Sequence, residues 1–364
     1  MGSGSLGELK SLGASLEEKG VSGSYLLRNS EVSLILKSYL ERKGVLFLDI
    51  REAKSRFNWL SRYVWKVLSA DMDEYTKLAS EEVEGGILLY VPKGAKVSLP
   101  LQACFLISKP RWEQVVHNVV IVGENAEVTL NTFCASTSKS ALHVGVTEIY
   151  VGRGARVNYV MVHGWREGVE ARPRTGVNVD EGGSISMYYI NLKPVSLIEM
   201  SPLIRLRRES SASLTSILMG LGSSRLEVGS RVELVGERAR ANVISRSIAK
   251  DEARVKMLGK LTSESRGSRG HLECKGLQLS PRAVIEAVPV LVSRNEESEL
   301  THEASIGRLS EEALYYLMSK GFTEEEAISM LVRGFIDVGL EDMPHTIKTQ
   351  ISIILNLIAK YGSG

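Results

Sequence analysis

Three residues in the last third of the chain carry side chains that bind metal ions. Cys274 is followed 28 residues later by the adjacent pair His302 and Glu303. Thiolate, imidazole and carboxylate groups all coordinate iron or zinc. The separation is close to the period of a sequence repeat, so the two positions can lie on neighbouring turns of a repeating structure. We therefore treat them as a candidate metal site, with a buried structural cysteine as the alternative.

Motifs for several other chemistries do not occur in the sequence. There is no phosphate-binding loop of the Walker type and no dinucleotide-binding glycine motif between a strand and a helix. A Gly-x-Ser-x-Gly nucleophile motif is also absent. A β-helix enzyme acting on polysaccharide would need acidic residues clustered along one strand face, and the repeat has none. We therefore expect a protein that is not an enzyme and keep the polysaccharide-active enzyme as a weaker alternative.

Composition and charge indicate which partners and which cellular location to expect. The chain has 364 residues, 43% hydrophobic and 24% charged, with a net charge of +2. This charge predicts no strong attraction to nucleic acid or membrane. Apolar runs such as Ile351–Ile358 fall short of the ~20 residues that span a bilayer, and the start lacks the apolar segment of a secretory signal. Three cysteines without a Cys-x-x-Cys pair lead us to expect a reducing, cytoplasmic location.

The central part of the chain, from about Ile87 to Leu261, is repetitive. A turn that contains glycine or glutamate recurs, and a short stretch with alternating apolar residues follows it. Successive turns are 29, 29, 29, 28 and 27 residues apart by subtraction; they lie at 94–97, 123–128, 152–157, 181–185, 209–214 and 236–239. A fixed period of roughly 20–50 residues is typical of solenoid proteins.

The residues after each turn alternate at period two, which indicates strands. Ala126, Val128 and Leu130 are an example. Stacked units of this kind bury one continuous core, so we predict a parallel β-helix, with a sandwich of meandering strands as the alternative. Cys134 shares the face of Val128 and Leu130 and should point into the core. His163 and Trp165 are likewise two apart and share one face, and a structural histidine is the alternative there.

Helical segments are expected on both sides of this core. We assign residues 1–84 to an N-terminal helical region, 85–304 to the β-helix and 305–364 to a C-terminal helical domain. In the first region, helices are predicted over Glu31–Lys43 and Asn58–Leu68 from their apolar spacing. In the last, a helix ends at Gly321, a second begins with a capping box at Thr323, and a third runs from Pro344 to Ile358.

The phrase His302-Glu303-Ala304-Ser305-Ile306-Gly307, with the helical stretch Glu311–Ala327 after it, resembles the SufB/SufD family of iron–sulfur cluster assembly proteins. The resemblance extends back through Tyr90-Val91-Pro92, Val119–Cys134 and Gly152–Trp165, and covers most of residues 87–340. It implies a right-handed parallel β-helix flanked by helical regions. It also implies a non-enzymatic scaffold of the SUF system, on which a nascent iron–sulfur cluster is built for transfer to apo-proteins.

The resemblance implies partners as well. An ABC-type ATPase (SufC) would bind the C-terminal helices and drive the scaffold. A second subunit would be another copy of the chain, giving a homodimer, or a SufB/SufD paralogue. A cysteine desulfurase system or another donor would supply sulfur, the bound cluster would be transient, and a need for reduced flavin stays open. The apolar residues of the helices that we expect to dock the ATPase are Leu314, Leu317, Met318, Leu331 and Phe335.

Individual site residues follow from the same resemblance. Cys274 matches the interface cysteine proposed as a cluster ligand in SufB, and His302 and Glu303 match a His-Glu pair proposed as further ligands. Cys134 matches the cysteine proposed to receive sulfur. His163 and Trp165 match a glutamine and a tryptophan proposed to line the path that sulfur follows inside the β-helix.

The sequence also departs from the SufB pattern. Histidine replaces glutamine at His163, and Leu106 and Ser108 stand where SufB has an arginine and an asparagine early in the path. Both cysteines make the chain SufB-like, whereas its short N-terminal region and the Ile306-Gly307 phrase lean toward SufD. The alternative reading is therefore a SufD-like structural subunit that supports a separate, cluster-holding homologue.

Overall fold

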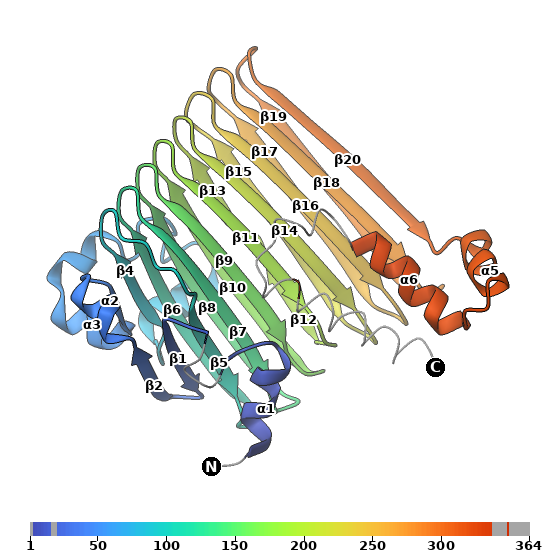
Figure 1. Cartoon of the computed structure of the whole chain (residues 1–364), viewed down its shortest axis with the longest axis horizontal. Coiled ribbons are helices and arrows are strands. Elements are labelled where there is room, and N and C mark those ends of the chain that lie inside the picture. Colours follow the sequence, from blue (N-terminus) through green and yellow to red (C-terminus); the bar gives the residue numbers. More distant parts are fainter. Residues whose placement is uncertain (1–2, 16–19, 337–347, 349–364) are drawn as a thin grey trace.

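The centre of the molecule is a β-solenoid made of two facing sheets (Figure 1). The computed structural model describes residues 3–15, 20–336 and 348. Each coil of the chain adds one strand to the first sheet and then one to the second. The mainly β fold with flanking helices that the repeat predicts is therefore confirmed.

The first sheet, called sheet A here, is parallel except for its first pair, β2 and β1. In spatial order its strands are β2 (Glu31–Leu36), β1 (Gly23–Arg28), β5 (Leu101–Ile107), β7 (Glu127–Ser136), β9 (Arg156–Gly164), β11 (Ser184–Asn191), β14 (Ser211–Gly220), β16 (Arg240–Ala249), β18 (Arg269–Gln278) and β20 (Glu299–Arg308).

The second sheet, called sheet B, faces sheet A and is parallel except for the pair of β3 and β4. In spatial order it contains β19 (Val284–Ser293), β17 (Arg254–Ser263), β15 (Arg225–Leu234), β12 (Leu197–Met200) with β13 (Leu203–Leu206), β10 (Val169–Val179), β8 (Ala141–Val151), β6 (Trp112–Val122), β4 (Ile87–Val91) and β3 (Leu46–Asp49).

The sequence period is the coil length. In sheet A, Leu101 pairs with Leu130 and Leu130 with Tyr159, each 29 residues on. In seven successive coils the recurring turn contains one residue with positive φ. Glycine adopts this conformation without strain, yet the position is occupied in order by Gly94, Asn125, Gly154, Gly182, Glu209, Arg238 and Gly267.

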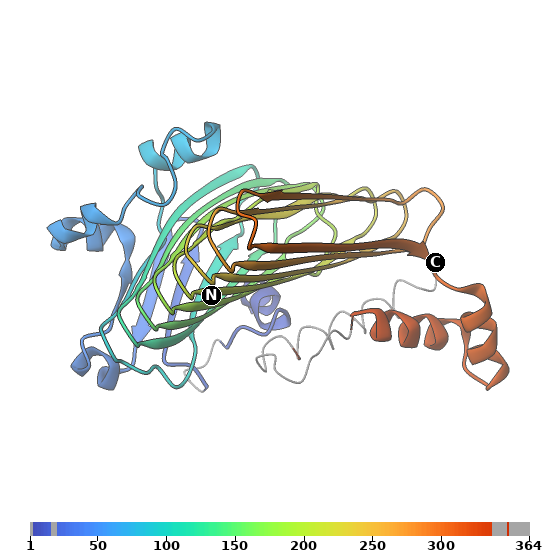
Figure 2. The same cartoon turned by 90° about the horizontal axis from the view of Figure 1, so that it is seen from above.

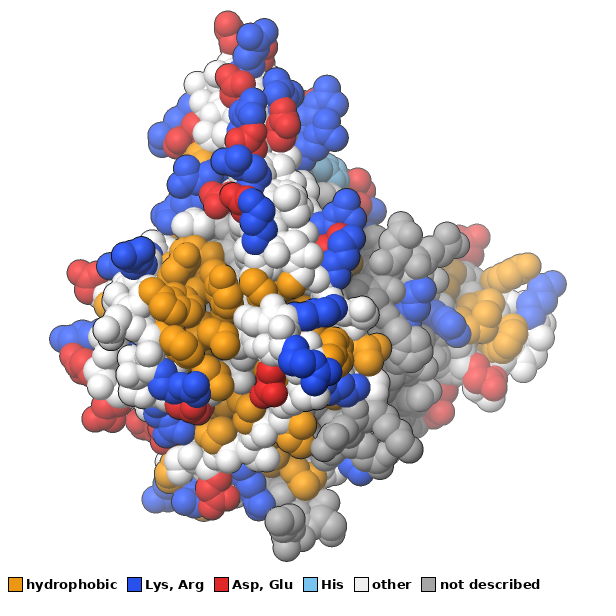
Figure 3. Space-filling model, turned by 60° about the vertical axis from the view of Figure 1, so that its left-hand side comes forward, with side chains coloured by type: hydrophobic (Ala, Val, Ile, Leu, Met, Phe, Trp, Pro, Cys, Tyr) orange, Lys and Arg blue, Asp and Glu red, His pale blue; other side chains and the backbone are white. Residues whose placement is uncertain are grey.

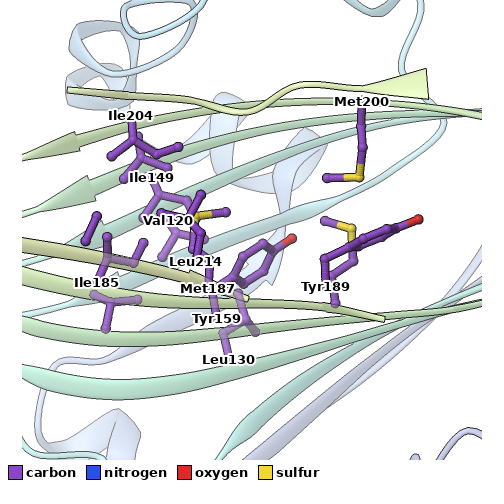
Figure 4. Close-up of a cluster of buried hydrophobic side chains, with 14 of the residues drawn as sticks. Val120, Leu130, Ile149, Tyr159, Ile185, Met187, Tyr189, Met200, Ile204 and Leu214 are labelled. Atoms are coloured by element: carbon purple, nitrogen blue, oxygen red, sulfur yellow. The ribbon is translucent and has the colours of Figure 1, made fainter. Parts of the chain in front are cut away.

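Side chains that alternate inward from both sheets fill the space between them. Figure 4 shows Tyr159 and Tyr189 of sheet A approaching Met200 and Ile204 of sheet B. Because neighbouring strands are in register, like positions stack in columns along the solenoid axis.

Helices cover the outer faces of the sheets (Figure 2). On sheet A, Leu9 of α1 (Ser3–Ser11), Leu12 just after it and Val332 of α6 (Glu324–Ile336) join an apolar cluster that contains Phe133 and Val162. Sheet B is covered by α3 (Ile50–Arg56), the 3-10 helix η1 (Asn58–Arg62) and α4 (Glu74–Glu81).

The predicted helix over Glu31–Lys43 is wrong. Glu31–Leu36 is strand β2, and only α2 (Ser38–Arg42) is helical. The apolar residues Val32, Leu34 and Leu36 fit period two as well as a helical stripe, and pairing with β1 decides between them. Hydrophobic side chains gather on this end of the molecule (Figure 3), where Val32, Ile35 and Leu99 are exposed.

The predicted helix over Asn58–Leu68 is shorter than expected. Only η1 forms, because the backbone N–H groups of residues 65–68 turn toward the buried carboxylate of Glu148 on β8. Trp65 adopts a φ of +58° in this turn. A tertiary contact thus overrides the local helical pattern.

The C-terminal helices begin where the caps predict. Ser310 accepts a hydrogen bond from the Ala313 N–H at the start of α5 (Glu311–Ser319), and Thr323 and Glu326 form a reciprocal capping box before α6. The helix predicted from Pro344 to Ile358 lies outside the described residues. Among the helices that the structure describes, none has the length and apolar character needed to cross a membrane.

Candidate functional site

The two cysteines singled out in the sequence both point into the solenoid, near its opposite ends. Cys274 on β18 is 1% exposed and lies in the interior core. In the next coil, Leu272 pairs with His302 and Cys274 pairs with Ala304. His302 is therefore on the same face of sheet A as Cys274 and diagonal to it, with Cα atoms ~8 Å apart from strand spacing and rise.

Glu303 lies on the other face of the sheet. Consecutive residues of a strand point to opposite sides, and Glu303 pairs in register with Glu273. On this outer face the Lys275 Nζ is 2.9 Å from a Glu273 carboxylate oxygen and 3.2 Å from a Glu303 oxygen. Glu273 also forms an ion pair with the buried Arg246. Glu303 is thus tied into a surface network and does not converge with Cys274 and His302.

A complete metal site is not present in one chain. Within residues 3–15, 20–336 and 348, no three His, Cys, Asp or Glu side chains are grouped closely enough to hold a metal ion. Cys274 and His302 together offer two donors. Any metal centre built on them needs donors from outside the described part of this chain.

These two donors lie at the open end of the solenoid. No described strand lies beyond β19 and β20, so each has one unpaired edge (Figure 1). Most of β20 is exposed, including His302 and Ile306, and Val288 and Val290 of β19 are exposed beside it. Long unpaired edges with apolar side chains favour pairing with another chain.

The second cysteine lies beside a histidine. Cys134 on β7 pairs in register with His163 on β9, and both are buried. The His163 Nδ1 is 3.0 Å from the Tyr189 hydroxyl oxygen on β11. The ring of Trp165 follows at 5.4 Å between centroids. The structure therefore brings Cys134, His163 and Trp165 together. Alternation predicted only the inward face of Cys134 and the shared face of His163 and Trp165.

Residues that the sequence did not point to complete this cluster. His143 enters from sheet B, with its ring 4.8 Å from that of Trp165 and its Nδ1 3.1 Å from the Gln114 Oε1. Tyr189 holds His163 as described. The inward position of Tyr189 follows from the alternation of its strand, but the sequence offers no signal that places His143 opposite Trp165, because the register between facing sheets is set by the corner loops.

A column of polar side chains runs from Tyr189 to Cys274 inside sheet A, and the contact between Tyr189 and His163 links it to the neighbouring column that contains Cys134. Tyr189 pairs with Ser216, Ser216 with Ser245, and Ser245 with Cys274. The hydroxyls of Ser216 and Ser245 are 2.9 Å apart. From β7 to β18 there are five strand steps, which corresponds to ~24 Å at the usual strand spacing.

The middle of this column borders an internal cavity of about 40 Å³. Its lining includes Tyr189, Ser216 and Ser245 from sheet A, and Met200 and Ser230 from sheet B. Several buried polar atoms along the interior have no hydrogen-bond partner within the described chain: Trp165 Nε1, Asn191 Oδ1, Ser230 Oγ and Ser247 Oγ. Unsatisfied buried polar groups cost free energy, so their presence calls for an explanation other than stability.

Burial keeps the interior groups neutral. It raises the pKa of the Cys274 thiol to about 11 and raises the pKa of Cys134 further. It lowers the pKa of His143 to about 3 and that of His163 well below its ordinary value, with His143 adding to the effect. At neutral pH the interior therefore holds thiols and uncharged imidazoles.

A pH dependence of stability follows from the buried histidines. Burial lowers the pKa of His117, and the hydrogen bond to Glu148 offsets this only in part; His143 and His163 are shifted in the same direction. The unfolded chain takes up these protons near pH 6.5 and the folded chain does not. The free energy of unfolding should thus be constant above pH 6.5 and fall below it, by up to ~1.4 kcal/mol per pH unit for each histidine.

Urea unfolding between pH 5 and pH 8 measures this dependence. Below pH 6.5, His143→Gln should reduce the slope of the free energy of unfolding against pH by the contribution of one histidine. A stability that is independent of pH between 5 and 6.5 would contradict the assignment of neutral buried histidines.

The ATPase-docking candidates are partly buried rather than exposed. Leu314, Leu317, Leu331 and Phe335 are half-buried, and only Met318 is exposed. The most exposed aromatic side chains of this region are neighbours on α5 that the sequence analysis did not single out. Tyr315 is 63% and Tyr316 61% exposed, and Phe322 and Met330 are also exposed. No residue of α5 is buried.

Comparison with known proteins identifies the family. The sequence model described as "SUF system FeS cluster assembly, SufBD core domain" matches residues 105–335. The chain belongs to the SufBD family. The matched range runs from within β5 to the last turn of α6, so it includes Cys134, the column from Tyr189 to Cys274, the open end and α5.

Curated relatives agree with this assignment. An iron–sulfur cluster assembly SufBD family protein of Archaeoglobus fulgidus is 36% identical over 344 residues, covering 94% of this chain and 92% of the relative. One of Methanothermobacter thermautotrophicus is 39% identical, covering 87% and 79%. One of Pyrococcus horikoshii is 31% identical, covering 95% and 79%. The resemblance seen in the residues is thereby confirmed, and iron–sulfur cluster assembly is the process to which this SufBD protein relates.

Proposed function

We propose that this SufBD protein is a non-enzymatic scaffold on which an iron–sulfur cluster is assembled at the open end of the solenoid. The observation that carries the proposal is the placement of Cys274 and His302. Both project from one face of sheet A at its last two strands, and no further coil follows among the described residues. The cluster is cargo: it is built, held and passed on.

Two copies of the chain would complete the donor set. A cluster requires four protein ligands, and pairs of thiolates with pairs of imidazoles are an established set. A two-fold interface duplicates every residue that it contains, so Cys274 and His302 would each occur twice. The unpaired edges of β19 and β20 supply the surface for such contact.

Glu303 would not belong to the ligand set formed by Cys274 and His302 of the two copies. Its carboxylate is held with Glu273 around Lys275 on the outer face. Carboxylate oxygens bind iron, so this pair offers a first binding place for incoming iron beside the assembly point. A direct ligand role for Glu303, as the resemblance implies, would require β20 to turn over at the subunit interface.

Sulfur would reach the site through the interior. Cys134 receives it from a cysteine desulfurase system or another donor. His163 and Trp165 line the start, and the hydroxyls of Tyr189, Ser216 and Ser245 continue toward Cys274. Trp165 Nε1 on this line and Ser230 Oγ at the cavity beside it have no hydrogen-bond partner within the described residues, which supports use of the line as a path.

The C-terminal helices would bind an ABC-type ATPase of the SufC kind. Exposed aromatic residues are typical anchors of interfaces, and α5 presents Tyr315 and Tyr316 with no buried residue of its own. We expect Tyr315→Ser combined with Tyr316→Ser to weaken ATPase binding about 100-fold by calorimetry, as loss of two anchors implies. A matched change on the same helix, Ser319→Ala, should leave affinity unchanged. Equal binding by the double variant would place the docking surface elsewhere.

Anaerobic reconstitution with iron and sulfide tests the scaffold role. Wild-type protein should develop the visible charge-transfer bands of an iron–sulfur cluster, and Cys274→Ala should lose them. Cys104→Ala is the matched control, since Cys104 is equally buried but points to the outer face of sheet A. Bands that persist in Cys274→Ala would overturn the assignment of the site.

The alternative is a SufD-like subunit that supports a separate, cluster-holding homologue. One chain offers only two donors, Cys274 and His302, and this fits the alternative if the homologue supplies the remaining cluster ligands. In that case the protein alone should form no cluster, and co-expression with the homologue should restore it. The same reconstitution, with and without reduced flavin, settles whether flavin is needed.

A further inference from the structure

His163 is the register partner of Cys134 on the next strand of sheet A. The two residues are paired in register on adjacent strands and both point inward, so their Cα atoms are ~4.8 Å apart. The His163 Nδ1 is 3.0 Å from the Tyr189 hydroxyl oxygen, and the two rings meet edge to face at 5.1 Å between centroids. The ring is thus fixed by Tyr189 beside the thiol.

This arrangement addresses a chemical difficulty at Cys134. The nucleophilic form of cysteine is the thiolate, but burial favours the neutral thiol. His163 is neutral for the same reason and therefore has a nitrogen lone pair. The other titratable groups facing this pair are His143 on β8, Tyr159 on β9 and Tyr189 on β11, whereas Cys104 on β5 lies on the outer face of sheet A. None of these is a carboxylate that would trap a proton on the imidazole.

We propose that His163, held in place by Tyr189, accepts the thiol proton of Cys134 when this cysteine takes up sulfur. The proposal rests on the sulfur-receiving role of Cys134 given above and adds a residue to it. When Nδ1–H donates to the Tyr189 oxygen, Nε2 carries the lone pair. Once Nε2 is protonated, the Tyr189 oxygen accepts from the charged ring and stabilises it.

The step balances with a persulfide, R–S–SH, as the sulfur donor. The Cys134 sulfur attacks the outer sulfur of the donor and forms a new S–S bond. The donor S–S bond breaks, and R–S⁻ leaves with its electron pair. The proton of Cys134 passes to His163 Nε2 and then to R–S⁻. The products are the Cys134 persulfide and R–SH, with no net oxidation or reduction.

The pH profile of Cys134 reactivity tests this role. Iodoacetamide is the probe, and mass spectrometry of the peptide that contains Cys134 gives the rate from pH 6.5 to 8.5. With His163 as base, the wild-type rate should vary less than about threefold, since the base is already unprotonated across this range. In His163→Gln the rate should fall about 100-fold at pH 7 and rise about tenfold per pH unit with the thiolate fraction.

Two further variants keep the test decisive. Tyr189→Phe removes only the hydroxyl that orients the ring and should lower the rate at pH 7 about tenfold; it also serves if His163→Gln fails to fold. His117→Gln is the matched control, because His117 is as buried as His163 but lies outside this cluster, where it contacts Glu148. It should keep the shallow profile. Parallel profiles of wild type, His163→Gln and Tyr189→Phe would overturn the proposal.

Failure of the inference is distinguishable from failure of the sulfur-receiving role. With inorganic tetrasulfide as donor, Cys134→Ala should abolish delivery of labelled sulfur to Cys274. If it does so while the pH profiles of the variants are parallel, only the role of His163 fails. If Cys134→Ala leaves delivery unchanged, the sulfur path itself fails.

Discussion

Replacing Ala304 by proline is expected to prevent the proposed pairing of two copies through β20 without unfolding the solenoid. The Glu299 N–H donates to the Ser268 carbonyl of the preceding coil. Because backbone groups alternate sides along a parallel strand, the N–H of Ala304 points to the open edge of β20. Proline at such an edge removes one donor and blocks pairing with another strand. The dimer dissociation constant should rise at least ~10-fold, which sedimentation velocity measures.

The neighbouring residue provides the control. The N–H of Ser305 points toward β18, so Ser305→Pro should break the internal ladder and loosen β20. Ala304→Pro should keep the wild-type melting temperature within a few degrees, whereas Ser305→Pro should lower it. Wild-type protein that stays monomeric at all concentrations, or a dimer that tolerates Ala304→Pro, would refute pairing through the β20 edge.

Removal of the Glu148 carboxylate should lower the free energy of unfolding by about 3–5 kcal/mol, the usual cost of breaking a buried charged network. Its two oxygens accept from the backbone N–H groups of Trp65, Lys66 and Val67 at 2.6, 2.8 and 2.9 Å, and from Leu68 at 3.4 Å. The His117 Nε2 lies 3.1 Å away. Glu148→Ala leaves these buried donors without an acceptor.

The effect has a matched control and a defined pH range. Burial raises the pKa of Glu148, but hydrogen bonds from His117 and from the backbone of Val67 and Trp65 outweigh it and hold the pKa below its ordinary value. The ionised Glu148 carboxylate therefore makes its full contribution to the free energy of unfolding above about pH 4.5, and this contribution is lost as the pH falls further. Glu113 is an exposed acid on the adjacent strand β6, and Glu113→Ala should change stability by less than about 0.5 kcal/mol. Equal urea midpoints for the two variants would contradict this account.

Much of the solenoid was predictable because it is repetitive. The 27–29-residue period gave the coil length, and alternation at period two placed Cys134 inward beside Val128 and Leu130. The N-terminal region was harder, since a single copy of a pattern must be judged by local spacing alone. Glu31–Leu36 fits strand and helix equally, and the pairing with β1 that decides it is not visible in the sequence.

The candidate site was predicted in part. The 28-residue separation correctly placed Cys274 and His302 on neighbouring strands. The adjacency of His302 and Glu303 within a strand already implies opposite faces, a signal that the metal-site hypothesis did not use. The position of His143 opposite Trp165 depends on how the two sheets face each other, and no spacing along one strand contains that information.

Stoichiometry of the assembled cluster tests the central claim most directly. We would reconstitute the protein anaerobically and determine mass by native mass spectrometry, together with iron and sulfide per chain. An open-end site built from Cys274 and His302 of two copies predicts one cluster for every two chains, bound only to the dimer and lost from Ala304→Pro monomers. One cluster per chain on a monomer would contradict a shared site at the end of the solenoid.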